Sequence, residues 1–162
     1  MGVSGVGKTT VAVRLAERLA LPYAEADDFH PAASIAKMRA GTPLDDADRE
    51  PWLLALGGWL GERAEDGSGG VVTCSALKRR YRDTLRAACP GVRFVHLSGS
   101  RELIAERLDG RSGHFMPASL LESQFATLEP LTPDEHGVVL DVGQDPEHLV
   151  TEAARLLGPR PT

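Results

Sequence analysis

Residues 2–9 read GVSGVGKT and match the pattern G-x-x-x-x-G-K-[ST]. Glycines at this spacing let consecutive backbone N–H groups turn inward around a polyphosphate, and the start of the following helix adds its dipole. In such a loop the lysine reaches the β- and γ-phosphates and the threonine hydroxyl holds Mg²⁺. The motif predicts a site for ATP and Mg²⁺ formed by Gly2, Ser4, Gly5, Val6, Gly7, Lys8, Thr9 and Thr10.

Carboxylates follow a weak strand candidate at residues 23–26. In a parallel sheet the strand ends that precede helices lie at the same edge as a phosphate loop. Glu25 and Asp27 lie two apart in an extended stretch, so we expect them to point to the same side. One could orient Mg²⁺ through water while the other accepts the proton of an attacking hydroxyl. The alternative is a solvated acidic turn.

A basic run follows the strand that ends at Cys74 and Ser75. Lys78, Arg82 and Arg86 lie four residues apart, so on a helix they form a positive stripe along one face. A stripe that begins at the sheet edge could bind an anionic substrate, because a guanidinium donates two parallel hydrogen bonds to a carboxylate. An exposed basic helix face is the alternative.

A glycine-containing segment between two predicted helices carries Arg107, Arg111 and His114 in or beside it. Cations that close over the phosphates would stabilise the transferred group and exclude water. We therefore expect a mobile lid at about residues 107–116. A plain connection between two helices is the alternative.

These side chains must be positioned by short β-branched runs that alternate with amphipathic helices. Such alternation predicts an α/β fold, with a parallel sheet covered by helices on both faces. We expect strands at residues 23–26, 71–74, 92–97 and 138–142, and helices at 8–20, 31–40, 45–67, 76–88, 101–108, 116–128 and 147–157.

The first strand of this pattern is missing, because only Met1 precedes the phosphate loop. Burying about five aliphatic side chains of such a strand contributes roughly 8–15 kcal/mol. That is as large as the net stability of a typical domain. We therefore expect a short apolar, β-branched run just upstream of Met1 in the functional protein.

Composition narrows the class of protein. The chain has 162 residues and a formal charge of −5, and we expect a single domain over residues 1–162. The excess of acidic over basic residues argues against nucleic-acid binding. No run of apolar residues approaches the roughly 20 residues that a membrane span needs. Two cysteines are too few for a disulfide framework, so we expect a cytoplasmic location.

Five segments together resemble the small P-loop gluconokinases. They are GVSGVGKT at 2–9, ADDFHP at 26–31, KMRAGTPLDDADREPWL at 37–53, CSALKRRYRD at 74–83 and GHFMPASLLESQFATLE at 113–129. The resemblance implies a nucleoside-kinase-like three-layer α/β fold with a five-stranded parallel sheet and an arginine-bearing lid. It also implies ATP- and Mg²⁺-dependent phosphorylation of D-gluconate to 6-phosphogluconate, commonly by a homodimer.

The resemblance also implies roles for individual residues. Asp27 matches the aspartate at the acceptor hydroxyl, and Glu25 stands where relatives often carry Asp as a metal partner of Thr9. The implied catalytic residues are Lys8, Asp27, Arg107 and Arg111, and the implied acceptor-binding residues are Asp27, His30, Lys37, Arg49, Ser75, Lys78, Arg82 and His114.

Two alternatives stay open at this point. A kinase for another small hydroxy-acid, such as shikimate, would use the same phosphate loop with different acceptor contacts. A nucleotide-dependent binding or switch protein would modify no small molecule and would need a partner surface.

Overall fold

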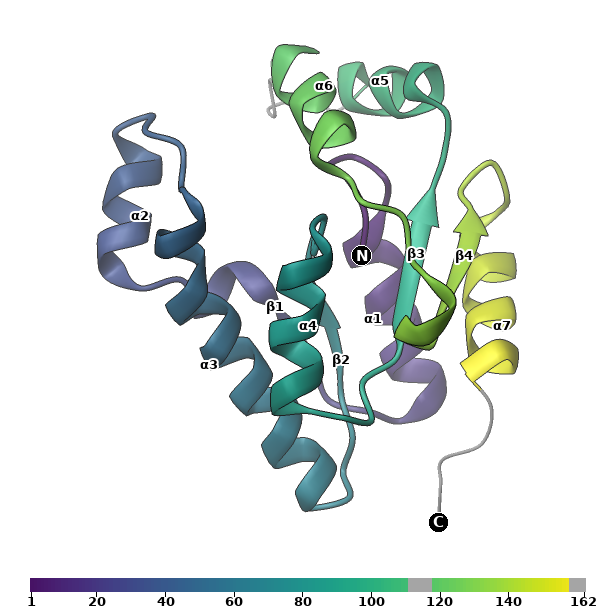
Figure 1. The fold of residues 1–162 in the computed structure, drawn as a ribbon. Coiled ribbons are helices and arrows are strands. Elements are labelled where there is room, and N and C mark those ends of the chain that lie inside the picture. The colour runs from purple at the N-terminus through teal and green to yellow at the C-terminus, as the bar shows by residue number, and fades with distance from the viewer. Residues whose placement is uncertain (111–117, 158–162) are drawn as a thin grey trace.

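The computed structural model describes residues 1–110 and 118–157 (Figure 1). In this described part no helix is long and apolar enough to cross a lipid bilayer. The helices are α1 Lys8–Leu19, α2 Ala32–Arg39, α3 Asp46–Glu65, α4 Arg79–Ala88, α5 Arg101–Asp109, α6 Ala118–Thr127 and α7 Pro146–Leu157, with short 3-10 helices at Ala26–Phe29 and Pro133–Glu135. The strands are β1 Tyr23–Glu25, β2 Val71–Thr73, β3 Phe94–Ser98 and β4 Gly137–Asp141.

The described strands form two parallel pairs. In the first pair, Tyr23 of β1 lies opposite Val71 of β2, and in the second, Phe94 of β3 lies opposite Gly137 of β4. The first two residues of the chain join the pairs. The Gly2 N–H donates to the Ser75 carbonyl beyond β2 (3.1 Å), and the Met1 carbonyl accepts from Leu97 of β3 (3.0 Å). The strand expected upstream of Met1 stays a prediction.

Helices cover both faces of the strands, which confirms the predicted three-layer α/β fold. On one face α3 and α4 pack together, and their buried side chains Leu56 and Leu85 belong to one cluster with Phe94 of β3. On the other face α1 packs against α7, and Leu15 clusters with Leu97, also of β3. Figure 1 shows α3 and α4 on one side of the strands and α7 on the other.

The strand predicted at residues 23–26 ends at Glu25, where the chain turns into the 3-10 helix Ala26–Phe29. Ala26 is buried, and its carbonyl accepts a hydrogen bond from the indole N–H of Trp52 (2.6 Å). The side chain of Asp27 is 91% exposed. The prediction that an extended backbone aligns Glu25 with Asp27 is therefore wrong, because burial of Ala26 bends the chain between them.

The predicted helix at residues 76–88 begins later, at Arg79. Ala76 has a positive φ of 44°, and Lys78 is extended (φ −93°, ψ 143°) at the residue before the helix. Lys78 is therefore not the first member of a helical stripe. It extends from the loop that connects β2 to α4.

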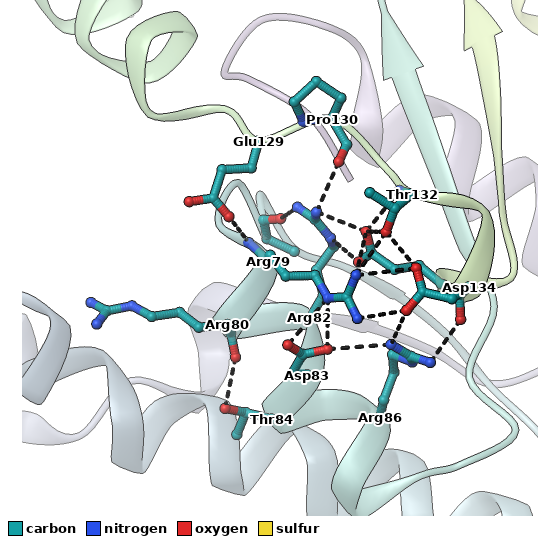
Figure 2. Close-up of polar contacts among 12 residues, drawn as sticks. Arg79, Arg80, Arg82, Asp83, Thr84, Arg86, Glu129, Pro130, Thr132 and Asp134 are labelled. Atoms are coloured by element: carbon teal, nitrogen blue, oxygen red, sulfur yellow. Dashed lines mark hydrogen bonds and ion pairs between the residues drawn. The ribbon is translucent and has the colours of Figure 1, made fainter.

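Arg82, on α4, is completely buried. Its guanidinium donates to both carboxylate oxygens of Glu135 and to the carbonyls of Ala76 and Leu77. It also donates to the carbonyl of Pro130 (Figure 2). These five contacts use all the N–H donors of a guanidinium. The prediction that Arg82 binds the acid substrate is therefore wrong: its charge is paired inside the protein and has no donor left for a ligand.

The rest of the basic face of α4 binds residues 129–135, which we call the strap. The Arg79 guanidinium donates to Thr132 and to both carboxylate oxygens of Asp134. Arg86 donates to the Asp134 carbonyl at 2.7 Å. Figure 2 shows these contacts converging on the strap from one side of the helix. The predicted positive stripe thus exists from Arg79 to Arg86, but it holds a segment of the same chain.

The Arg82–Glu135 pair makes stability depend on pH. Burial alone raises the pKa of the Glu135 carboxyl, but hydrogen bonds from Arg82 and Thr132 outweigh it and lower the pKa from 4.5 to about 2. The unfolded state therefore takes up this proton first as the pH falls. The stabilisation is complete above about pH 5 and is lost progressively toward pH 2.

We expect Glu135→Gln to lower the free energy of unfolding by roughly 3–5 kcal/mol at pH 7, because it leaves the buried Arg82 charge without its counter-ion. Urea unfolding should be measured from pH 7 to about pH 3. The difference in free energy of unfolding between wild type and Glu135→Gln should become smaller below about pH 5. Glu152→Gln, in a surface pair with Arg155, is the control and should change stability little. If this difference in free energy of unfolding stays constant over the whole pH range, the lowered pKa of Glu135 is contradicted.

Candidate active site

The phosphate loop begins at Gly2, outside any strand or helix, and enters α1 at Lys8. Gly2, Gly5 and Gly7 all have positive φ angles (139°, 80° and 100°), a conformation that side chains with a Cβ rarely adopt. No side chain caps the start of α1 at Gly7, so an anion can take that place. Val6 is 1% exposed as a whole residue and packs in the buried cluster that also contains Leu97 and Leu108.

Lys8 folds back over the beginning of its own loop. Its Nζ donates to the carbonyls of Gly2 (3.0 Å) and Val3 (2.9 Å). These contacts place the ammonium group beside the loop, where a triphosphate bound to the loop would meet it.

Glu25 connects the phosphate loop to the end of β1. Its carboxylate accepts hydrogen bonds from the hydroxyls of Thr9 (2.8 Å), Tyr23 and Thr73. Burial alone raises the pKa of Glu25, but the three hydroxyl groups outweigh burial, so the pKa lies below its ordinary value. An ionised carboxylate next to a hydroxyl is a pair of hard oxygen donors, which suits Mg²⁺ that takes its other ligands from phosphate and water.

Asp27 presents an accessible carboxylate directly after Glu25. His30 lies beside it, with Nε2 3.9 Å from Oδ1 of Asp27 and only 6% of the His30 side chain exposed. The imidazole stacks on Trp52, with the ring centres 4.5 Å apart. Burial lowers the pKa of His30, so the ring is neutral at pH 7. The exposed carboxylate is thus bordered by a fixed, uncharged ring.

Lys78 and Arg49, two of the cations expected at the acceptor, meet around Tyr81. The Lys78 ammonium lies 3.0 and 3.2 Å from the two carboxylate oxygens of Asp46, and the Tyr81 hydroxyl donates to the same carboxylate. The guanidinium of Arg49 lies 6.0 Å from the centre of the Tyr81 ring. The starts of α3 and α4 therefore build one mixed-charge cluster.

Lys37, the third expected cation, is paired with Asp48 at 2.5 Å. Asp48 also exchanges hydrogen bonds with Asp45 in a capping box at the start of α3. Sequence reasoning missed these carboxylates and that of Asp46 as partners of the cations. The spacing of Asp45 and Asp48 was the available signal, since residues three apart form a capping box before a helix.

Of the other predicted site residues, Ser75 and Arg107 lie in the part of the chain that the structure describes, and Arg111 and His114 do not. Ser75 lies at the start of the phosphate loop, where its carbonyl accepts the Gly2 N–H. Arg107 of α5 donates to the carbonyl of Val142, just after β4 (2.6 Å). Arg111 and His114 lie outside the described residues, as does most of the expected lid.

Comparison with known protein families, sequences and solved structures identifies relatives of this chain. A family model described as an AAA domain matches residues 1–131. The gluconokinase of Gluconobacter oxydans is 50% identical over 155 residues, which cover 96% of this chain and 87% of that protein. The unliganded crystal structure of a sugar kinase from Janibacter sp. has a TM-score of 0.89 at 55% identity, over 97% of this chain and 91% of that one. A gluconokinase structure from Sinorhizobium meliloti has a TM-score of 0.84 at 46% identity, over 97% and 88% of the two chains. The chain belongs to the gluconokinase family of P-loop kinases.

Proposed function

We propose that the protein transfers the γ-phosphoryl group of ATP to D-gluconate, giving 6-phospho-D-gluconate. The observation that carries this proposal is the hydrogen bond from Thr9 to Glu25, which ties the phosphate loop to the segment that presents Asp27. A triphosphate on the loop and a hydroxyl at Asp27 would then lie at the same edge of the sheet. The names of the relatives support gluconate as the acceptor.

On the nucleotide side, the backbone N–H groups that follow Ser4, from Gly5 to Thr10, bind the phosphates, because those of Gly2 and Ser4 already donate to Ser75 and Gln124. The Lys8 ammonium group offsets the negative charge that builds up on the transferred group. Mg²⁺, which Thr9 and Glu25 would hold together with the phosphates, supplies further neutralisation of that charge. Arg107 and Arg111 act from the lid side and help to exclude water from the reaction.

On the acceptor side, Asp27 orients the attacking hydroxyl and accepts its proton. Lys78, Lys37 and Arg49 bind the carboxylate and neighbouring hydroxyl groups of the sugar acid. They are already fixed by Asp46, Asp48 and Tyr81, so little side-chain entropy is lost when the acceptor arrives. His30, Ser75 and His114 complete the acceptor-binding set.

We also propose that the protein is a cytoplasmic homodimer. Two buried, unpaired cysteines, Cys74 and Cys89, suit a reducing compartment. Burial raises the pKa of the Cys74 thiol to about 11, which keeps it protonated and unreactive. Leu54 and Val139 are more than half exposed, and apolar side chains of this kind are candidates for a subunit contact.

A coupled assay for ADP release, run over a panel of sugar acids and shikimate, tests the proposed reaction. We expect release that depends on gluconate and is abolished in Lys8→Ala, because that variant removes the ammonium group that stabilises the transferred phosphoryl. Arg155→Ala, which alters an exposed pair on α7, is the control and should retain full activity. Release that depends on a different acid, or on none, contradicts gluconate as the acceptor.

Asp27→Asn should lower kcat by about 10²–10⁴-fold with little change in the KM for gluconate, because the amide keeps the size of the side chain but cannot accept the proton. The carboxylate is 91% exposed, so the fold should be unaffected. Asp28→Asn, the adjacent exposed aspartate, is the matched control. Equal losses of kcat in Asp27→Asn and Asp28→Asn would show that Asp27 is not the group that accepts the proton.

Lys78→Met should raise the KM for gluconate about tenfold or more and leave the KM for ATP within about twofold. Loss of a hydrogen bond to a charged group costs about 1.5–3 kcal/mol, and each 1.4 kcal/mol is a factor of ten. Steady-state kinetics with each substrate varied in turn measures both constants. The assignment fails if the KM for ATP rises as much as that for gluconate.

A further inference from the structure

Gln124, on α6, lies against the phosphate loop. Its Oε1 accepts the backbone N–H of Ser4 at 2.7 Å, and its Nε2 donates to the hydroxyl oxygen of Ser4 at 3.0 Å. The two contacts fix which way the amide faces, because the N–H of Ser4 can only donate. One side chain of α6 therefore binds both the backbone N–H and the hydroxyl of a single loop residue that lies 120 positions away in the chain.

Ser4 is the point at which such a contact restrains the loop most. It lies between Gly2 and Gly5, which both have positive φ angles and belong to no strand or helix. Glycines impose few limits on the backbone, so the loop needs outside contacts to keep one shape. Leu108 of α5 supplies another: a Cβ added at Gly5 would lie 2.6 Å from Cγ of Leu108.

The far end of α6 is anchored to α4. The Glu129 N–H, two residues beyond the helix, donates to the carbonyl of Leu77 at 2.8 Å. The Glu129 carboxylate accepts the backbone N–H of Arg79, at the start of α4 (Figure 2). The buried Arg82–Glu135 pair then holds the remainder of the strap. The helix that carries Gln124 is thus fixed to the loop from which Lys78 extends.

We propose that Gln124 is a positioning residue for ATP. By binding the N–H and hydroxyl of Ser4, it keeps the N–H groups that follow in the loop turned toward the triphosphate. It acts through Ser4 and needs no contact with either substrate. The inference rests on the ATP-binding part of the proposed function and does not depend on which acid is the acceptor.

Titration calorimetry with Mg²⁺ and a non-hydrolysable ATP analogue, without any acceptor, tests this proposal. Gln124→Met keeps the length of the side chain and removes both hydrogen bonds, and we expect it to weaken analogue binding about tenfold. Gln124→Asn is one methylene shorter, cannot span both contacts, and should show a similar loss. Ser123→Ala, an exposed position on the same helix, is the matched control and should bind normally.

Two further measurements separate positioning from general destabilisation. The KM for the acid substrate should stay within about twofold in Gln124→Met, and the thermal midpoint should match that of Ser123→Ala. In a Ser4→Ala background, Gln124→Met should cost less affinity than in wild type, because one partner is already gone. The proposal is overturned if analogue affinity is unchanged, or if it falls together with acid affinity and the thermal midpoint. Failure of wild type to bind the analogue at all would instead reject the proposed function.

Discussion

A loop that binds a triphosphate through its backbone must hold several N–H groups in one direction without a helix or sheet to enforce it. Here the glycines at positions 2, 5 and 7 permit that shape but cannot maintain it. The shape comes from contacts at each part of the loop: the Ser75 carbonyl at Gly2, Gln124 at Ser4 and Leu108 against Gly5. Each contact arrives from a different element, so the fold as a whole maintains the loop.

Charge is used in two different ways around this loop. On the proposed acceptor side, Lys78 and Lys37 are partly exposed and paired with carboxylates at the start of α3. Arg82 carries the same charge but is fully buried and paired with Glu135. A buried charge that loses its partner is costly, whereas a partly solvated pair can exchange partners at little cost. Burial therefore separates the cations that can bind substrate from the one that holds the strap.

Much of the fold and part of the site could be predicted from the sequence. Hydrophobic periodicity located the helices, and the phosphate-loop pattern located Lys8 and Thr9, because both signals depend on near neighbours in the chain. The position of Asp27 after β1 was predicted correctly, but the extended backbone predicted there was wrong. The chain bends after Glu25 because Ala26 is buried and its carbonyl accepts a hydrogen bond from Trp52. Arg82 was misassigned because helical spacing describes a face of a helix and does not say what covers that face.

By itself, the sequence determined the alternation of strands and helices, the phosphate loop, and the resemblance to one kinase family. Each of these depends on residues that are close together in the chain. The tertiary structure alone decided which polar residues meet. Gln124 reaches Ser4 across 120 residues, and Arg82 reaches Glu135 across 53. No spacing rule links residues so far apart, because their contact depends on how α4, α6 and the strap pack together. The physical reason is that hydrogen bonds and ion pairs act over a few ångströms, so only the folded chain selects their partners.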